Sequence, residues 1–307
     1  MYVVPVAEFM RMTAARPHQV LVVEGTALDF GTFVRGIAVF VSHQWCGRNH
    51  ADPGFKQLRI LQCVFRHAMA GNLQMDVDFI TMLRFNRRTT CSAKDFRPAS
   101  TWFMWYDYFS VPQPGAACAG DVDYNDIGSD LGKAVASLSS YVAQCKYFFI
   151  LAPTITHEAG HQIGYSSWKG RGWCRFERLS RALTGMSSDS RMLLVRREDM
   201  VFEVGAQDYL FDPVGFGDFG FEGDRDQLAP RIEGLLRERL QFFLDGGRVQ
   251  EYRRLLAFAS SLLRGLPAAR SHAMPQPMPD GGQSRVDGFL RFKRFRGSGK
   301  REDATLS

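Results

Sequence analysis

Apolar residues gather into four short runs that are bounded by polar or turn-forming residues. These runs are Ile37–Ser42, Trp102–Phe109, Tyr147–Ala152 and Met192–Val195. Runs without polar alternation are typical of strands buried on both faces, as in parallel sheets covered by helices. Helical spacing of apolar residues lies between them, over Phe55–Ala68 and Leu131–Cys145. This alternation of strand and helix predicts a doubly wound α/β domain with a parallel sheet.

The same pattern predicts four regions along the chain. Residues 1–36 form an N-terminal extension, and residues 37–205 form the α/β domain, in which the Arg- and Lys-bearing stretch 71–100 is an insertion. Residues 206–265 combine a Gly/Asp/Phe-rich segment with two helices, about 229–244 and 248–265, which we expect to pack on the core as a helical C-terminal extension. Residues 266–307 begin with a proline-rich stretch and are predicted to be a disordered basic tail.

Composition favours a cytoplasmic protein. With 307 residues, of which 45% are hydrophobic, the chain can bury one large core or two modest ones. No window approaches the run of about 18 apolar residues that a membrane span requires. The first ten residues lack a basic stretch and carry Glu8, unlike a signal peptide. Six cysteines lie far apart without a Cys-x-x-Cys pair, which fits reduced thiols better than disulfides or zinc.

The net charge of +6 comes from the C-terminal tail. Residues 285–301 hold seven Lys or Arg and one Asp, so the rest of the chain sums to zero. The basic pI is therefore no indication that the globular part binds nucleic acid. The tail interleaves Phe289, Phe292 and Phe295 with cations, a pattern that can contact anionic lipid or nucleic acid. A solvated terminus is the alternative.

One acidic residue stands out in the segment Arg171-Gly-Trp-Cys-Arg-Phe-Glu177. It places Glu177 one helical turn after Trp173, on a helix that follows the buried run 147–152. Ligands of open α/β sheets bind beyond the carboxyl ends of the strands. Glu177 is therefore a candidate active-site carboxylate. Spacing alone also allows an ordinary ion pair between Glu177 and Arg181, four residues later.

Three separated motifs occur in the order found in one family. These motifs are 36–45 (GIAVFVSHQW), 102–113 (WFMWYDYFSVPQ) and 171–177 (RGWCRFE). Together they resemble the TIR (Toll/interleukin receptor) domain. The resemblance covers about residues 37–205. It implies a flavodoxin-like fold with strand order 2-1-3-4-5 and a cleft between the first and third strands. It also implies that Glu177 is catalytic in cleaving NAD, which is then a substrate and no cofactor, and that copies of the chain self-associate through TIR-like surfaces.

The first strand runs into Ser42, His43, Gln44 and Trp45, which we expect to line the same cleft. Trp45 could stack on a nicotinamide or adenine ring, and His43 or Gln44 could bind ribose or phosphate. The alternative is that His43 and Trp45 are packing residues at the sheet edge. TIR enzymes commonly carry an aromatic residue and Arg or Gly after this serine, so the His-Gln-Trp sequence departs from the family pattern.

Two further residues belong to the predicted ligand site. Asp107 lies where the second strand meets the long segment Val111–Asp130, which is a predicted binding loop or lid. A turn-initiating role is the alternative for Asp107. Trp173 precedes Glu177 by one helical turn and is expected to face the same ligand.

The sequence His157-Glu-Ala-Gly-His161 matches the zinc-protease pattern H-E-x-x-H. That chemistry requires both histidines on one face of a helix and a third ligand downstream. Pro153, Gly160 and Gly164 surround or interrupt the motif, and no apolar helical face accompanies it. We therefore expect a loop without a metal site, and a zinc hydrolase is the least favoured function.

Three functions remain open from the sequence. The first is cleavage of the nicotinamide–ribose bond of NAD through Glu177. The second is a non-enzymatic TIR-like module that signals by self-assembly, which the unusual residues after Ser42 favour. The third is a hydrolase or transferase that acts on another nucleoside N-glycoside with the same carboxylate.

Overall fold

A computed structural model of the chain describes residues 1–79, 82–83, 91–114, 129–184, 191–205, 211–221 and 223–267. The chain divides into two compact units, Met1–Pro275 and Gln276–Ser307. The predicted basic tail from residue 268 onward, and residues 115–128 of the predicted loop, lie outside the described residues.

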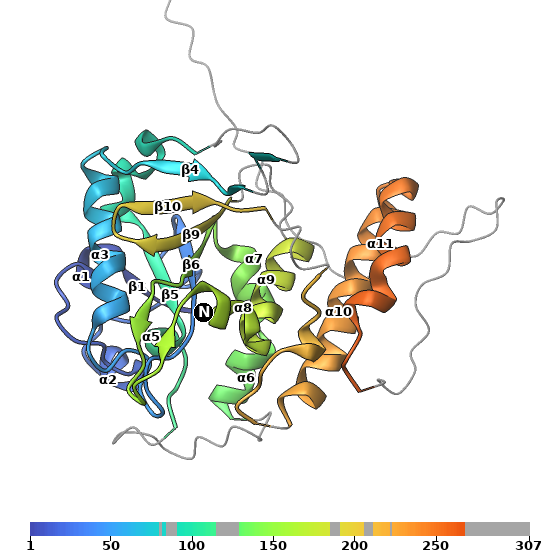
Figure 1. Cartoon of the computed structure of the whole chain (residues 1–307), viewed down its shortest axis with the longest axis horizontal. Coiled ribbons are helices and arrows are strands. Elements are labelled where there is room, and N and C mark those ends of the chain that lie inside the picture. The colour runs from blue at the N-terminus through green and yellow to red at the C-terminus, as the bar shows by residue number, and fades with distance from the viewer. Residues whose placement is uncertain are drawn as a thin grey trace, which may run out of the picture. The chain divides into compact units, whose positions relative to one another are not determined.

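An eight-stranded mixed sheet forms the centre of the first unit, in the order β2-β1-β5-β3-β6-β9-β10-β4 (Figure 1). The strands are β1 (Tyr2–Pro5), β2 (Leu28–Asp29), β3 (Ala38–His43), β4 (Met75–Val77), β5 (Phe103–Tyr106), β6 (Tyr147–Leu151), β9 (Arg191–Arg197) and β10 (Met200–Glu203). The four predicted strands are β3, β5, β6 and β9, and they pair in parallel with β3 between β5 and β6. The carboxyl ends of these strands therefore meet at one edge.

The expectation of a purely parallel sheet is wrong on both sides of this centre. The strand β1 pairs antiparallel with β5 and with β2, and β10 pairs antiparallel with β9. Only two residues separate β9 from β10, and so short a turn forces an antiparallel hairpin. The extension over residues 1–36 thus contributes two strands. The insertion over 71–100 contributes β4, which pairs in parallel with β10.

Helices cover both faces of the sheet (Figure 1). The chain before β6 contains α1 (Val6–Phe9), α2 (His18–Val23), α3 (Lys56–Met69), the 3-10 helix η1 (Ala93–Thr101), α5 (Asp107–Ser110), α6 (Asp130–Ala136) and α7 (Leu138–Gln144). The chain after β6 contains α8 (Tyr165–Gly170), α9 (Gly172–Thr184), the 3-10 turn η3 (Val214–Phe216), α10 (Asp224–Asp245) and α11 (Val249–Leu262). The single helix predicted over 131–145 is wrong, because Ser137 leaves helical geometry and separates α6 from α7.

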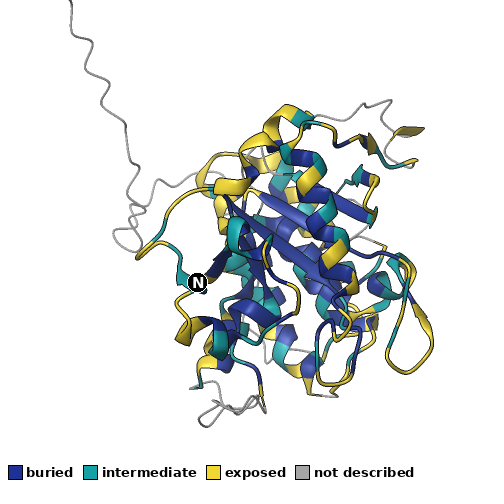
Figure 2. Cartoon of the chain, turned by 90° about the vertical axis from the view of Figure 1, so that its left-hand side faces the viewer, coloured by how far each residue is buried: buried dark blue, intermediate teal, exposed yellow. Residues whose placement is uncertain are grey.

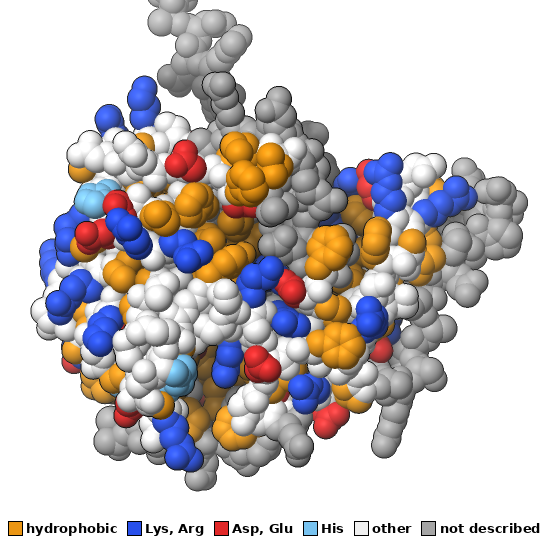
Figure 3. All heavy atoms as spheres, in the orientation of Figure 1, with side chains coloured by type: hydrophobic (Ala, Val, Ile, Leu, Met, Phe, Trp, Pro, Cys, Tyr) orange, Lys and Arg blue, Asp and Glu red, His pale blue; other side chains and the backbone are white. Residues whose placement is uncertain are grey.

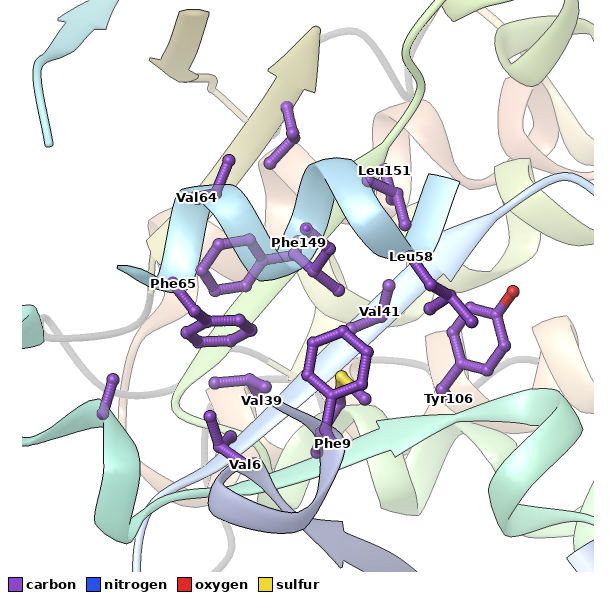
Figure 4. Packing of buried hydrophobic residues seen from close by; sticks show 14 of the residues in the cluster. Val6, Phe9, Val39, Val41, Leu58, Val64, Phe65, Tyr106, Phe149 and Leu151 are labelled. Atoms are coloured by element: carbon purple, nitrogen blue, oxygen red, sulfur yellow. The ribbon is translucent and has the colours of Figure 1, made fainter. Parts of the chain in front are cut away.

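Two hydrophobic clusters, one on each face, explain the continuous apolar runs. On one face, Val39, Val41 and Phe149 pack beneath Leu58 and Phe65 of α3 (Figure 4). On the other, alternate residues of the same strands, including Phe40 and Phe148, pack against α7, α9 and α10. Neighbouring residues of a strand point to opposite faces, so a strand buried on both faces needs apolar residues throughout. The strands β3 and β6 are accordingly buried over their whole length (Figure 2).

Of the two C-terminal helices, α10 packs on α9. The 22-residue α10 contacts α9, and α11 returns along α10. Gly172, the first residue of α9, allows the closest approach: an added Cβ would come within 2.0 Å of the Phe219 ring. The start of α9 is therefore fixed from two sides, by the sheet and by the segment that leads into α10.

The described helices and cysteines bear on membrane insertion and on disulfide formation. Within the described ranges, no helix is long and apolar enough to cross a membrane. No two of the five cysteines that the structure describes form a disulfide with each other. On the face of the molecule in Figure 3, Lys and Arg side chains are scattered among acidic and apolar ones, without gathering into one basic patch.

Candidate functional site

A hydrogen bond joins the end of β3 to the middle of α9. The Ser42 hydroxyl donates to Glu177 Oε2 at 2.5 Å, across 135 residues of sequence. The indole N–H of Trp168, on α8, donates to Ser42 Oγ at 3.0 Å. Because Ser42 has one proton and accepts from Trp168, that proton is directed at Glu177. This relay of two hydrogen bonds, from Trp168 to Ser42 and from Ser42 to Glu177, fixes one oxygen of the Glu177 carboxyl group.

Burial changes the acidity of this carboxyl group. The Glu177 side chain is half-buried, and loss of hydration raises its pKa to about 8. The hydrogen bond from Ser42 acts in the opposite direction, and the nearby charge of Asp107 adds to the increase. At pH 7 most copies of the ligand-free protein therefore carry a proton on Glu177. Shifts of this kind are enriched at functional sites, although structural networks produce them too.

The alternative role for Glu177, an ion pair with Arg181, is not formed in the structure. Arg181 is buried, and its guanidinium donates to the backbone carbonyls of Val142, Cys145, Lys146 and Arg191. Arg181 thus holds α9 to the end of α7 and to the first residues of β6 and β9. Helical spacing suggested the ion pair, but α9 is covered on more than one side and the Arg181 side chain turns inward.

A second carboxyl group, that of Asp107, lies directly after β5 and is held by three donors. His43 Nε2 lies 2.7 Å from Asp107 Oδ1, and the backbone N–H of Tyr108 donates to the same oxygen at 2.6 Å. The indole N–H of Trp45 donates to Oδ2 at 2.8 Å. Burial acts to raise the pKa of Asp107, but His43 and the other donors outweigh it, so this pKa is lowered.

Consecutive residues of β3 hold the two carboxyl groups, one on each side of the strand. Ser42 bonds Glu177 and His43 bonds Asp107, and side chains of neighbouring strand residues point to opposite faces. The register pairs Val41 with Tyr106, so the next residues, Ser42 and Asp107, follow at the same edge. The structure thus places two hydrogen-bonded groups at the carboxyl ends of β3 and β5: Ser42 with Glu177, and His43 and Trp45 with Asp107.

The ring of His43 belongs to the interior of this network. Its side chain is 2% exposed and stacks on Tyr106 with ring centroids 4.1 Å apart. Its second nitrogen, Nδ1, lies 3.3 Å from the Tyr106 hydroxyl. Both ring nitrogens therefore have protein partners, and the arrangement favours a supporting role over direct contact with ribose or phosphate.

Two predicted ligand residues make their hydrogen bonds elsewhere. The backbone carbonyl of Gln44 accepts a hydrogen bond from the side chain of Gln57. The side-chain oxygen of Gln44 is buried and has no hydrogen-bond partner among the described residues. The indole N–H of Trp173 donates to Asp224, the first residue of α10, at 2.8 Å. Trp173 thus ties α9 to the C-terminal helices.

Sequence reasoning missed Trp168, Tyr106 and Cys174 as parts of the site. Trp168 directs the Ser42 proton, Tyr106 supports His43, and the Cys174 thiol donates to the His43 carbonyl at 3.4 Å. Tyr106 and Cys174 lie inside the motifs 102–113 and 171–177, so their closeness in sequence to Asp107 and Glu177 was a signal that could have identified them. Trp168 lies before the third motif, and only the fold places its indole beside β3.

The H-E-x-x-H segment forms a loop, as predicted. Residues Ile155–Thr156 (β7) and Gln162–Ile163 (β8) pair as a hairpin, and Gly160 takes a positive φ in its turn. His157 and His161 stack with ring centroids 4.5 Å apart. In the part of the chain that the structure describes, no group of three His, Cys, Asp or Glu residues is arranged to hold a metal ion.

Fold and site together define an α/β protein with two hydrogen-bonded carboxyl groups at the carboxyl ends of its parallel strands. No protein-family model matches the chain, and no curated protein and no solved structure matches it. The inference of function therefore depends on the chemistry of the site and on the resemblance of its motifs.

Proposed function

We propose that this chain cleaves the bond between ribose and nicotinamide in NAD, with Glu177 as the catalytic carboxylate. The observation that carries the proposal is the hydrogen bond from Ser42 to Glu177, which joins two of the three TIR-like motifs at the strand ends. The order of the four central strands, β5-β3-β6-β9, supports the flavodoxin-like arrangement that the resemblance implies.

The chemistry needs a negative charge beside the ribose. The C1′–N bond breaks with its electron pair on nitrogen, which neutralises the cationic nicotinamide ring, so this leaving group needs no acid. Positive charge then develops on the ribosyl group, as in glycoside hydrolysis. Water adds at C1′ and releases one proton, giving ADP-ribose and nicotinamide. A cationic ring bound near Glu177 also favours the ionised form of that carboxyl group.

The test is release of free nicotinamide from NAD by the purified full chain, followed by chromatography. The Glu177→Gln variant keeps the shape of the side chain but cannot carry the charge. We expect its turnover to fall about a hundredfold or more, since one preorganised charge-stabilising group contributes roughly 3 kcal/mol. Glu238→Gln, at an exposed position of α10, is the matched control and should keep the parent rate.

Two results would reject this function. One is full turnover by a folded Glu177→Gln variant. The other is a parent protein that releases no nicotinamide at any pH between 6 and about 9, a window that covers both forms of Glu177. The second result would favour the non-enzymatic TIR-like module, with self-association as its activity.

A further inference from the structure

Asp107 combines a fixed position with access to solvent. Three donors hold its carboxylate, yet 33% of the side chain is exposed. Oδ1 takes two of these hydrogen bonds and Oδ2 takes one. Because a carboxylate oxygen accepts about two hydrogen bonds, the group keeps acceptor capacity for a ligand. The neighbouring His43 ring is buried, so Asp107 is the end of this network that a ligand can reach.

We propose that Asp107 is a second catalytic carboxylate, which contacts the ribosyl group together with Glu177 and supplies fixed negative charge while the C1′–N bond breaks. His43 and Trp45 are its positioning residues. The inference rests on the proposed function, because it assigns a role in the same reaction.

The backbone supports a shared ligand for the two carboxyl groups. Glu177 is anchored by Ser42 and Asp107 by His43, so consecutive residues at the end of one strand hold them. They come from elements on either side of β3: Asp107 follows β5, and α9 follows β6. A ribosyl group above the end of β3 would lie between them.

Their environments separate the roles of the two groups. Desolvation raises the pKa of Glu177 to about 8, whereas hydrogen bonds and the charge of His43 lower that of Asp107. Asp107 is therefore the anion near pH 7, when most Glu177 is protonated, so the two carboxyl groups ionise in different pH ranges. The other titratable groups that interact with this pair are His43 on β3, Tyr106 on β5, Tyr108 on α5 and Cys174 on α9.

The test compares Asp107→Asn with Asp199→Asn, which changes an exposed aspartate in the β9–β10 turn. We expect kcat for NAD to fall about ten- to a hundredfold in Asp107→Asn, as for loss of one charge-stabilising group. The control should keep the parent kcat. The pH profile gives a readout that a purely structural role would not move. The midpoint of the pH profile reports the ionisation of Glu177. Loss of the Asp107 charge should shift this midpoint to lower pH, because that charge helps to raise the pKa of Glu177.

A folded Asp107→Asn variant with kcat within about threefold of the parent and an unchanged midpoint would overturn the inference. If that variant does not fold, Trp45→Phe replaces it, since this change removes the donor to Oδ2 and leaves the charge. We expect kcat to fall about threefold to tenfold in Trp45→Phe, and the parent value would count against the inference. Inactive parent protein, or an active Glu177→Gln variant, would instead reject the proposed function and this inference with it.

Discussion

Ser42 donates its only proton to Glu177, and this bond links a strand residue to a helix residue 135 positions later. The same hydroxyl oxygen accepts a hydrogen bond from the indole N–H of Trp168. One oxygen of the Glu177 carboxyl group is therefore bound to the protein. The relay makes the carboxyl group rigid before any ligand arrives, which is the condition under which a charged group stabilises a transition state best.

Replacing Arg181 by Lys should destabilise the fold. The guanidinium donates to four carbonyls at the ends of α7, β6 and β9, and a lysine ammonium cannot reach all of them. Buried carbonyls without donors cost free energy, so we expect the free energy of unfolding to fall by roughly 2–4 kcal/mol. Urea titration measures it. Arg197→Lys, in an exposed pair with Asp199, should change it by less than about 1 kcal/mol.

Glu177→Gln should stabilise the protein at neutral and alkaline pH. The pKa of Glu177 lies near 8 in the folded protein, above its ordinary value of 4.5. The contribution of this group to stability is thus fully present below pH 4.5 and is lost as pH rises toward 8. Glutamine stays neutral, so the variant should gain roughly 1–3 kcal/mol over the parent at pH 8 and little at pH 4. Urea titrations at both pH values test this, and an equal difference at pH 4 and pH 8 would contradict it.

The sequence predicted the central strands and the position of Glu177 because both depend on local patterns. Apolar runs identify strands buried on two faces, and parallel strands bring Ser42 and Asp107 to one edge. Spacing alone left open an ion pair between Arg181 and Glu177, because helical spacing does not report that α9 is also covered by α7 and α10. Trp168 was missed because its contact with Ser42 spans 126 residues and has no local signal.

The edges of the sheet were beyond sequence reasoning for a related reason. The edge strands β2 and β4 contain two and three residues, too few for a periodic pattern. The strand β1 has four residues, and β1 belongs to the sheet only through its pairing with β5, about 100 residues later. Pairing over such distances is decided by tertiary packing and not by the apolar pattern of the segment.

Activity toward NAD should rise with pH. Glu177 stabilises the developing positive charge in its ionised form and not in its protonated form, and its pKa in the ligand-free protein is about 8. We therefore expect kcat/KM to increase about tenfold per pH unit below pH 8 and to level off above it. The Glu177→Gln protein supplies the background rate at each pH. A profile that falls as pH rises through 8 would show that Glu177 acts as an acid, which favours cleavage of a neutral nucleoside.

Ser42→Ala should move the midpoint of this pH profile to higher pH, opposite to the shift expected for Asp107→Asn. The hydrogen bond from Ser42 favours the charged form of Glu177, so its loss raises the pKa of that carboxyl group above the parent value. The carboxyl group also loses its anchor, and we expect turnover at pH 7 to fall about tenfold. Ser140→Ala, at an exposed position of α7, is the control. If Ser42→Ala kept the parent midpoint and rate, the relay from Trp168 through Ser42 would have no part in catalysis.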